Sequence, residues 1–333
     1  MTPSRLAKEC IGKLSTYPLN SFLLPGNCTI FTFHRVLSQA EYRDSEVLRS
    51  ILVDDHALRK FLQHIKTKFH IISLQELIDF QKEKSHPSNQ VAYACITFDD
   101  GWKDNYTNAF PVLKELEVPA TIFLSTNFIG SNSGFWWQNL GDALCKKDLS
   151  EDQAHALRRL LLPYVDIRLI DTWDIGQIIR IINDQYYNDA TSIAEKALAI
   201  NKTKPGPQAL DWSHCMEMSA HNISFGSHTL SHPRLSLLNP SELEEELARS
   251  KSTIIDKNIN YVNAICYPYG NTDADVLLEA KEHYDIGFTT QPGISRIHLD
   301  SPMAIPRINI PQALALTSGR LNYSLIRAYL PGR

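Results

Sequence analysis

Residues 91–102 read VAYACITFDDGW, and this stretch decides the fold of the 333-residue chain. Its apolar first half predicts a buried strand of a parallel sheet, and Gly101 marks the turn that ends the strand. Asp99 and Asp100 therefore sit where a core strand runs into a turn. Carboxylates are costly to bury without a partner, and neighbouring side chains on a strand point to opposite faces. We expect the pair to divide its work, one carboxylate binding a metal and the other reaching a substrate.

A second polar cluster lies far downstream, where residues 228–233 read HTLSHP after a short predicted strand at 223–227. His228 and His232 are four residues apart, and on a helical turn positions i and i+4 share one face. Either motif alone is a weak signal, because Asp-Asp-Gly commonly forms a simple turn. Together they supply two imidazoles and a carboxylate, a ligand set that leaves coordination positions open. We expect Asp100, His228 and His232 to meet at neighbouring strand ends.

Strand-like and helix-like segments alternate along most of the chain, which is typical of a parallel sheet covered by helices. The predicted strands are 28–33, 70–73, 91–98, 120–125, 223–227, 262–267, 286–290 and 303–310. Predicted helices include 55–65, 74–81, 105–116 and 272–284, and another begins at Pro240. From about 131 to 218 the apolar spacing is helical throughout, which predicts a helical insertion in the sheet rather than a second catalytic domain.

Three motifs resemble those of the polysaccharide deacetylase family, which is also called carbohydrate esterase family 4 or the NodB-homology family. They are TFDDG at 97–101, HTLSHP at 228–233 and YPYG at 267–270. The resemblance implies an α/β fold, a distorted (β/α)7-type barrel with a helical insertion. It also implies a metal-dependent hydrolase that removes N-acetyl groups from an N-acetylated sugar in a polysaccharide or glycan precursor.

The same resemblance divides the chain into four parts. They are an N-terminal extension (1–27), the deacetylase barrel (28–130 and 219–310), the helical insertion (131–218) and a C-terminal tail (311–333).

The resemblance also implies roles for individual residues. Asp99 would be the general base, and Asp100, His228 and His232 would bind the metal. The backbone amide of Tyr269 would help form the oxyanion hole. Zn²⁺ is the first choice of metal, although a ligand set of two histidines and one aspartate also suits Co²⁺, Ni²⁺, Mn²⁺ or Fe²⁺.

Two positions depart from the family pattern. The third motif often carries an arginine two residues before its proline, and Cys266 stands there. Arg307, in the last predicted strand, is the candidate replacement, with a structural or surface role as the alternative. The usual C-terminal histidine motif is missing, and His298 is a poor match. His34, which ends the first predicted strand, is therefore the candidate general acid, as the resemblance to biofilm poly-N-acetylglucosamine deacetylases implies; His298 is the alternative.

Aromatic residues close to the motifs are candidates for substrate binding, because the C–H faces of sugars pack on aromatic rings. The candidates are Trp102, Trp136, Trp137 and Tyr267. For the tryptophan pair, the alternative is that it anchors the insertion to the barrel.

Composition limits the partners and the compartment. Hydrophobic residues make up 43% of the chain, charged residues 21%, and the net charge is −4, which gives no electrostatic case for nucleic acid or an anionic membrane. Six scattered cysteines without a Cys-x-x-Cys pair favour a reducing compartment. Charges interrupt residues 1–24, so no secretory signal is predicted and a cytoplasmic location is expected. Membrane contact is expected only through a lipid-linked substrate, and the oligomeric state is not predicted.

Two other functions stay open at this point. One is a metal-dependent amidohydrolase acting on a non-sugar C–N bond, which would release ammonia or urea rather than acetate. The other is a non-catalytic carbohydrate-binding protein with the same fold. The presence of all four residues Asp99, Asp100, His228 and His232 argues against the second alternative.

Overall fold

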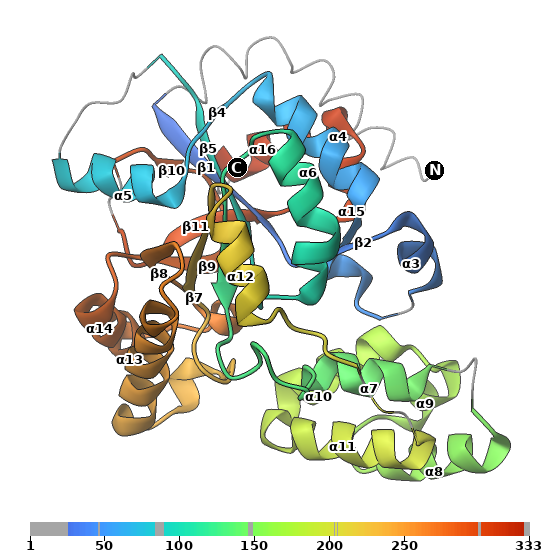
Figure 1. Ribbon diagram of the computed structural model, residues 1–333. Helices are drawn as coiled ribbons and strands as arrows, with labels where there is room; N and C mark the ends of the chain where they lie inside the picture. Colours follow the sequence, from blue (N-terminus) through green and yellow to red (C-terminus); the bar gives the residue numbers. More distant parts are fainter. Residues whose placement is uncertain are drawn as a thin grey trace.

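The computed structural model describes residues 26–45, 47–83, 90–145, 149–202, 204, 206–298 and 301–329. Within them, seven parallel strands close a barrel (Figure 1), in the order β1-β11-β9-β8-β7-β6-β5, with β5 pairing again with β1. These strands are β1 (Asn27–Phe33), β5 (Tyr93–Phe98), β6 (Ala120–Leu124), β7 (Ile223–Ser227), β8 (Tyr261–Cys266), β9 (Ile286–Pro292) and β11 (Ile305–Asn309). The predicted distorted (β/α)7 barrel is confirmed.

Short strands extend this barrel at its margins. β10 (Ser295–Arg296) pairs antiparallel with β1, and β4 (His70–Ile71) pairs parallel with β5. A separate parallel pair joins β2 (Arg35–Leu37) to β3 (Leu52–Asp54). The short helix α3 (Gln39–Asp44) and the turn η2 (Arg49–Ile51) lie between these two strands in sequence, and η2 lines the cavity described below.

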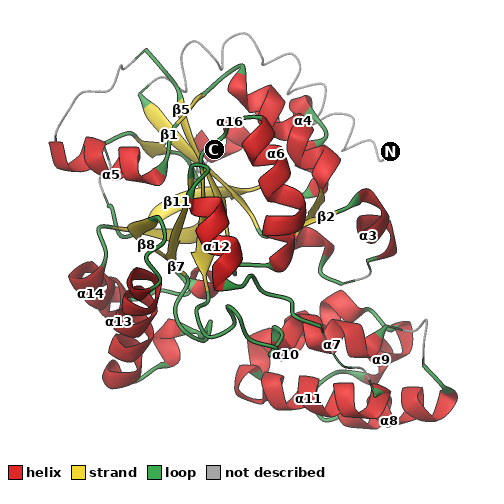
Figure 2. Ribbon diagram, viewed as in Figure 1, coloured by secondary structure: helices red, strands yellow, loops and turns green. Residues whose placement is uncertain are grey.

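Helices surround the strands, as Figure 2 shows. They are α4 (Asp55–Lys66), α5 (Leu74–Glu83), the π-turn η3 (Asn105–Ala109) with α6 (Phe110–Glu115), α12 (Trp212–Ser219), α13 (Pro240–Asp256), α14 (Ala274–His283), α15 (Gln312–Ala315) and α16 (Ser318–Tyr329). Their starts follow from local sequence. Asp54 accepts a hydrogen bond from the Ala57 N–H at 2.7 Å to cap α4, and α13 begins with a capping box of Asn239 and Glu242.

The described helices of the insertion gather at one end of the molecule (Figure 1, green to yellow). They are α7 (Trp136–Leu144), α8 (Glu151–Leu161), α9 (Ile167–Thr172), α10 (Ile175–Gln185) and α11 (Ala190–Asn201). α7 packs against α11, whereas α12 packs against β7 of the barrel although the prediction assigned most of it to the insertion. The domain boundaries stay a prediction, and the N-terminal extension lies almost entirely outside the described residues.

Parallel pairing brings the carboxyl ends of the strands to one edge of the barrel. Phe33 of β1 lies beside Phe98 of β5, and Leu124 of β6 lies beside Ser227 of β7. The residues that follow these strands, among them His34, Asp99 and His228, therefore meet at that edge.

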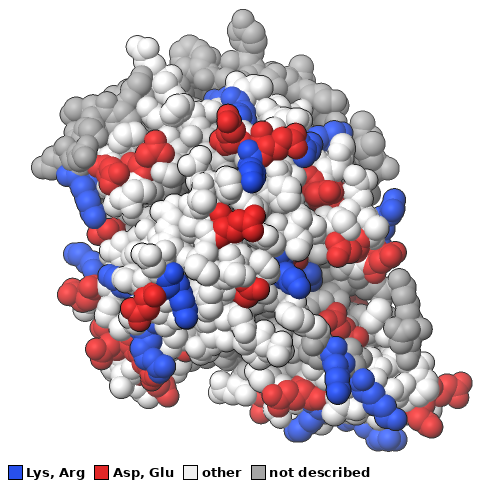
Figure 3. All heavy atoms as spheres, viewed as in Figure 1, with Lys and Arg blue, Asp and Glu red and all other residues white. Residues whose placement is uncertain are grey.

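The described surface gives no sign of a large single-charge region on the face that Figure 3 shows, where acidic and basic side chains are interspersed. In the described part of the chain, every helix is too short or too polar to cross a bilayer.

Candidate active site

The carboxyl ends of the strands open into a cavity of about 630 Å³. Its lining includes His34, Asp99, Asp100, Trp136, Trp137, His228, His232, Tyr267 and Tyr269. The structure thus brings together residues that are far apart in the sequence, and it adds one wall from α10 of the insertion, which contributes residues between Gly176 and Asn183. The cavity size lies within the roughly 300–1,000 Å³ typical of ligand sites.

Asp99 is paired with Arg307. The guanidinium Nη1 and Nη2 lie 2.8 and 2.7 Å from the two carboxylate oxygens, and both side chains are buried. Burial by itself would raise the pKa of Asp99, but the charge and the two hydrogen bonds of Arg307 lower it to about 2. Asp99 is therefore an ionised carboxylate in a fixed orientation at neutral pH.

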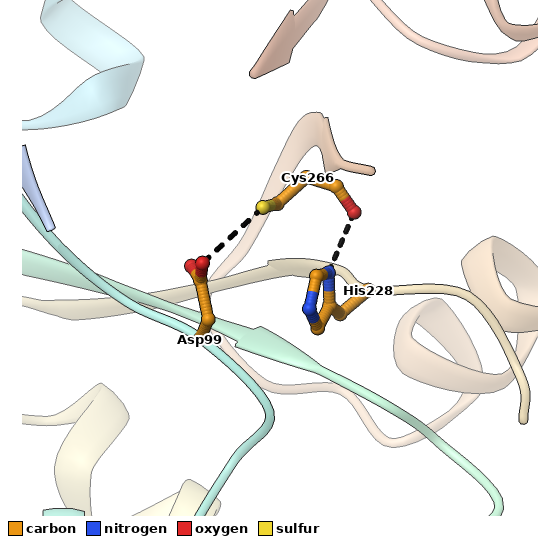
Figure 4. Close-up of side chains that lie close together, drawn as sticks. All are labelled: Asp99, His228 and Cys266. Atoms are coloured by element: carbon orange, nitrogen blue, oxygen red, sulfur yellow. Dashed lines mark hydrogen bonds between the residues drawn. The ribbon is translucent and has the colours of Figure 1, made fainter. Parts of the chain in front are cut away.

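Arg307 reaches this position from β11 through the barrel interior. Its Nε donates to the Thr289 carbonyl at 3.0 Å and its Nη1 to the Thr32 hydroxyl at 3.0 Å, and these bonds hold the guanidinium in one orientation. Arg307 thus contacts both carboxylate oxygens of Asp99, the contact expected of a residue that replaces the missing motif arginine. The residue at the motif position, Cys266, instead directs its Sγ toward Asp99 Oδ2 at 3.5 Å (Figure 4), and burial raises the pKa of this thiol.

Asp100 is oriented by Trp102. The indole Nε1 donates to Asp100 Oδ2 at 2.7 Å, which leaves Oδ1 directed toward the two histidines. Asp100 has a φ of 76° and Gly101 a φ of 80°, so the chain turns sharply here. A Cβ on Gly101 would lie 2.9 Å from side-chain atoms of Leu124 and Ile129, which is why glycine is required after the aspartates.

His228 and His232 lie close together, but the predicted helical turn between them is wrong. Residues 228–232 form a loop in which Thr229 and His232 have φ values of 67° and 61°. Glu246 of α13 fixes this loop by accepting hydrogen bonds from the N–H groups of Leu230 and Ser231 at 2.8 and 3.0 Å. The two imidazole centroids are 4.8 Å apart, so left-handed residues rather than helical spacing bring them to one side.

The three predicted ligands fit a divalent metal. His228 Nε2 and His232 Nε2 lie 3.3 and 3.4 Å from Asp100 Oδ1, and ligands at about 2.1 Å from a tetrahedral metal lie about 3.4 Å apart. His228 Nδ1 lies 2.6 Å from the carbonyl oxygen of Cys266 (Figure 4), a bond that holds the proton on Nδ1 and leaves Nε2 available as a ligand. Hydrogen bonds from both histidines outweigh burial and lower the pKa of Asp100.

A second trio, Asp99, His228 and Cys266, also offers donor atoms within 4.8 Å of one another (Figure 4). Its chemistry suits a metal less well. Arg307 already neutralises Asp99, and His228 Nδ1 is engaged by the Cys266 carbonyl. The trio of Asp100, His228 and His232 is therefore the better site.

His34 follows β1 and places its Nε2 3.8 Å from Asp99 Oδ2. Its Nδ1 has no hydrogen-bond partner among the described residues. The alternative acid, His298, follows Ile297, whose N–H donates to Gly26 at the other end of β1. A seven-residue strand spans roughly 20 Å, so His298 is at the wrong end of the barrel and His34 is the better candidate.

Tyr269 occupies a strained turn in the third motif, with a φ of 59°. The N–H groups of Gly270 and Asn271 close this turn on Tyr267 and Pro268, and no turn bond in the described part of the chain uses the N–H of Tyr269. Gly270 has a φ of 64°, and a Cβ there would collide with Thr290. Strained backbone of this kind is often retained at functional sites.

The four aromatic candidates separate into two groups. Trp136 and Trp137 line the cavity, and the side chains of Trp136 and Tyr269 lie next to each other there. Trp137 also packs against His232, with ring centroids 4.9 Å apart. The ring of Phe135, just before the pair, packs on the ring of Trp102 with 4.3 Å between their centroids. Phe135 therefore anchors the start of the insertion to the barrel.

The prediction that Trp102 and Tyr267 bind substrate needs correction. Trp102 is fully buried beneath Asp100, and the guanidinium of Arg35 lies 4.4 Å from its ring. The Tyr267 side chain is fully buried, and its hydroxyl donates to the Met303 carbonyl at 3.0 Å. Neither ring has a face free for a sugar.

Sequence reasoning missed several residues that shape the site. Glu246 fixes the histidine loop, and Arg35, held by Asp104, lies over the Trp102 ring. Tyr187 of the insertion bonds the His232 carbonyl, and Arg234, just after the histidine loop, bonds the Asn183 carbonyl of the insertion. Glu246 lies in the acidic run 244–246, and no local signal distinguishes it from its neighbours.

Comparison with known proteins identifies the family of the chain. The family model for polysaccharide deacetylases matches residues 87–285, more than half of the chain. The chain therefore belongs to the polysaccharide deacetylase family.

Individual relatives are more distant. The chain is 27% identical to YxkH of Bacillus subtilis over 199 residues, covering 60% of this chain and 44% of that protein. It is 35% identical to the poly-β-1,6-N-acetyl-D-glucosamine N-deacetylase of Staphylococcus epidermidis over 129 residues, covering 36% and 42%. The matches thus span less than half the length of these curated relatives.

Solved structures show the same fold. The Streptococcus pyogenes deacetylase PplD, in complex with acetate, superposes with a TM-score of 0.59 at 19% identity and covers 92% of this chain and 100% of its own. IcaB from Ammonifex degensii superposes with a TM-score of 0.57 at 15% identity, covering 89% and 97%.

The ligand geometry leads to a prediction about metal content. We expect the purified protein to carry about one divalent metal per chain, and His228→Ala or Asp100→Ala to lose it, because two remaining donors compete poorly with water. Asp99→Asn should keep the metal, since Asp99 is bonded to Arg307. Metal analysis by mass spectrometry after dialysis measures this. Full occupancy in the Asp100→Ala/His228→Ala double variant would show that the metal binds elsewhere.

Proposed function

We propose that the protein is a metal-dependent deacetylase that removes acetyl groups from an N-acetylated sugar in a polysaccharide or glycan precursor. The observation that carries the proposal is one cavity in which an Arg307-bound Asp99 lies beside the three-ligand set. Membership of the family and the activity named for the Staphylococcus epidermidis relative support it. The cytoplasmic location expected from the sequence stays a prediction.

A divalent cation held by Asp100, His228 and His232 would polarise the acetyl carbonyl and lower the pKa of a water beside it. Asp99 accepts the proton of this attacking water. With a pKa of about 2, Asp99 is always ionised at neutral pH but is a weak base. It therefore depends on the increased acidity of the water to accept the proton.

The remaining steps use two further groups of the chain. Attack forms a C–O bond and leaves a negative charge on the former carbonyl oxygen, which the Tyr269 N–H stabilises as a donor. Breaking the C–N bond then requires a proton on the departing amine, and His34 supplies it. His34 and Asp99 line the same cavity with 3.8 Å between their nearest nitrogen and oxygen, so both reach one acetamide. The products are acetate and a free amino sugar.

The substrate would contact the tryptophan pair. Trp136, Trp137 and Tyr269 line the cavity, so their rings are the candidates for packing on the C–H face of a sugar. A non-catalytic binding role is a weaker explanation, because binding a sugar alone needs no ionised carboxylate beside a metal-ligand set.

The central test is acetate release. We expect the metal-loaded protein to release acetate from N-acetylated oligosaccharides, a chelator to abolish release, and Asp99→Asn to lower turnover by about a hundredfold to ten-thousandfold, because an amide cannot accept the proton of water. An enzymatic acetate assay measures turnover, with metal content and melting temperature as controls for the variant. Release of ammonia from a non-sugar amide, with no acetate from any sugar, would favour the amidohydrolase alternative.

The acid role of His34 has a separate test. His34→Ala should lower sugar deacetylation by about a hundredfold, keep the metal and lose the fall in rate at alkaline pH, because no acid remains to be deprotonated. An aryl acetate ester is the matched control, since a phenolate leaves without a proton. We expect His34→Ala to keep most of its ester hydrolysis and Asp99→Asn to lose it. Equal losses on sugar and ester would contradict the acid role.

A further inference from the structure

Two arginines at the cavity are not explained by the mechanism. Arg49 lies in the turn η2 and Arg180 in α10 of the insertion, and both line the cavity. Arg49 donates to the Arg43 carbonyl at 3.3 Å and lies 5.1 Å over the Tyr42 ring, which are both uncharged groups. Both side chains are exposed, and neither arginine forms an ion pair within the described part of the chain.

The carboxylates of the cavity are already engaged. Asp99 is bonded to Arg307, and Asp100 belongs to the metal ligands. Asp174 caps α10 by accepting from the Gln177 N–H at 3.0 Å and from Gln177 Nε2 at 2.9 Å. With a divalent cation bound, the charges that line the cavity sum to a positive value, in a chain whose net charge is −4.

From this charge balance we infer that the substrate carries an anionic group, a phosphate or a carboxylate, next to the N-acetylated sugar, and that Arg180 and Arg49 bind it. The inference rests on the proposed function and names its substrate class. A guanidinium matches both anions because it offers a planar fork of donors. An anion anchored at the cavity wall would orient the acetamido group toward Asp99 and the metal ligands.

Calorimetry on the zinc-loaded Asp99→Asn variant tests this without turnover. The probes are N-acetylglucosamine, N-acetylglucosamine 1-phosphate, a disaccharide of glucuronic acid and N-acetylglucosamine, and inorganic phosphate. We expect at least one anionic sugar to bind about tenfold tighter than the neutral sugar, because one charge-assisted contact has about this effect. The phosphate and carboxylate arms distinguish the two sources of charge, and inorganic phosphate alone should bind weakly.

Arg180→Gln should remove most of the advantage of the anionic sugar. Arg168→Gln is the matched control, since Arg168 is an exposed insertion arginine that pairs with Asp166 and does not line the cavity. Equal binding of neutral and anionic sugars, or an advantage that survives in the Arg49→Gln/Arg180→Gln double variant, would overturn the inference. Failure of the proposed function would appear differently, as no acetate release from any sugar.

A second set of contacts joins the insertion to the metal ligands. Tyr187, in the turn η5 (Tyr187–Asp189) after α10, donates its hydroxyl to the backbone carbonyl of His232 at 3.1 Å. Arg234, two residues after His232, donates from Nη2 to the Asn183 carbonyl at 3.1 Å and pairs with Asp184 at 3.1 Å. The C-terminal end of the loop that carries the third ligand is therefore bonded to the insertion at two points, His232 and Arg234.

Ring contacts extend this connection to the third motif. The Arg234 guanidinium lies 5.0 Å from the Tyr269 ring and 5.9 Å from the Tyr187 ring. The Tyr269 ring in turn lies 4.7 Å from the imidazole of His232. Because His232 and Tyr269 both have left-handed backbone conformations, they need surrounding contacts to hold them.

These contacts point to Tyr187 and Arg234 as positioning residues that hold His232 in its ligand orientation. The insertion then contributes to metal binding without providing a ligand. Groups behind a metal ligand commonly change metal affinity by about tenfold to a hundredfold when they are removed.

Zinc affinity, measured by competition with a chelator, tests this role. Tyr187→Phe and Arg234→Gln should weaken zinc binding about tenfold and lower kcat more than KM, while the melting temperature of the metal-free protein stays close to that of the wild type. Tyr186→Phe is the matched control, because Tyr186 packs on Tyr164 inside the insertion. Unchanged zinc affinity in both Tyr187→Phe and Arg234→Gln would overturn the role.

Discussion

Two buried carboxylates next to each other in the chain, Asp99 and Asp100, are the constraint on which the rest of the site depends. Buried charges are tolerated only when they are paired, and adjacent residues cannot share one partner without bringing their charges together. The left-handed conformation of Asp100 separates them. The Asp99 carboxylate bonds to Arg307, and the Asp100 carboxylate faces His228 and His232, with which it forms the candidate metal site.

The pairing with Arg307 has consequences for both stability and chemistry. The folded pKa of Asp99, about 2, lies below its unfolded value of about 3.9. The resulting stabilisation is complete above the unfolded value and is lost as the pH falls toward the folded one. The same shift makes Asp99 a poor base, so in the proposed mechanism it would accept a proton only from a water acidified by a cation held at Asp100, His228 and His232.

Most of the fold and the central ligands follow from local sequence, whereas their supports do not. Alternating strands and helices predict the barrel, and Asp100, His228 and His232 are recognisable because each motif follows a predicted strand. The spacing of the histidines suggested a helical turn, but Thr229 and His232 are left-handed and Glu246 holds the loop. Trp102 was predicted to bind sugar because the sequence does not reveal how deeply a side chain is buried, and its ring is fully buried. Arg307 could only be guessed, since its contact with Asp99 spans 208 residues.

The insertion forms one wall of the cavity without interrupting the barrel. β6 and β7 pair along their length, from Ala120 beside Ile223 to Leu124 beside Ser227, although the insertion lies between them in sequence. The barrel therefore closes as if the insertion were absent, and the metal ligands keep their positions at the strand ends. The insertion leaves from the carboxyl end of β6, the edge where the cavity lies, so α10 becomes a cavity wall. Changes on α10 would then alter the wall of the cavity, while the Tyr187 and Arg234 contacts limit how far the insertion can move without disturbing His232.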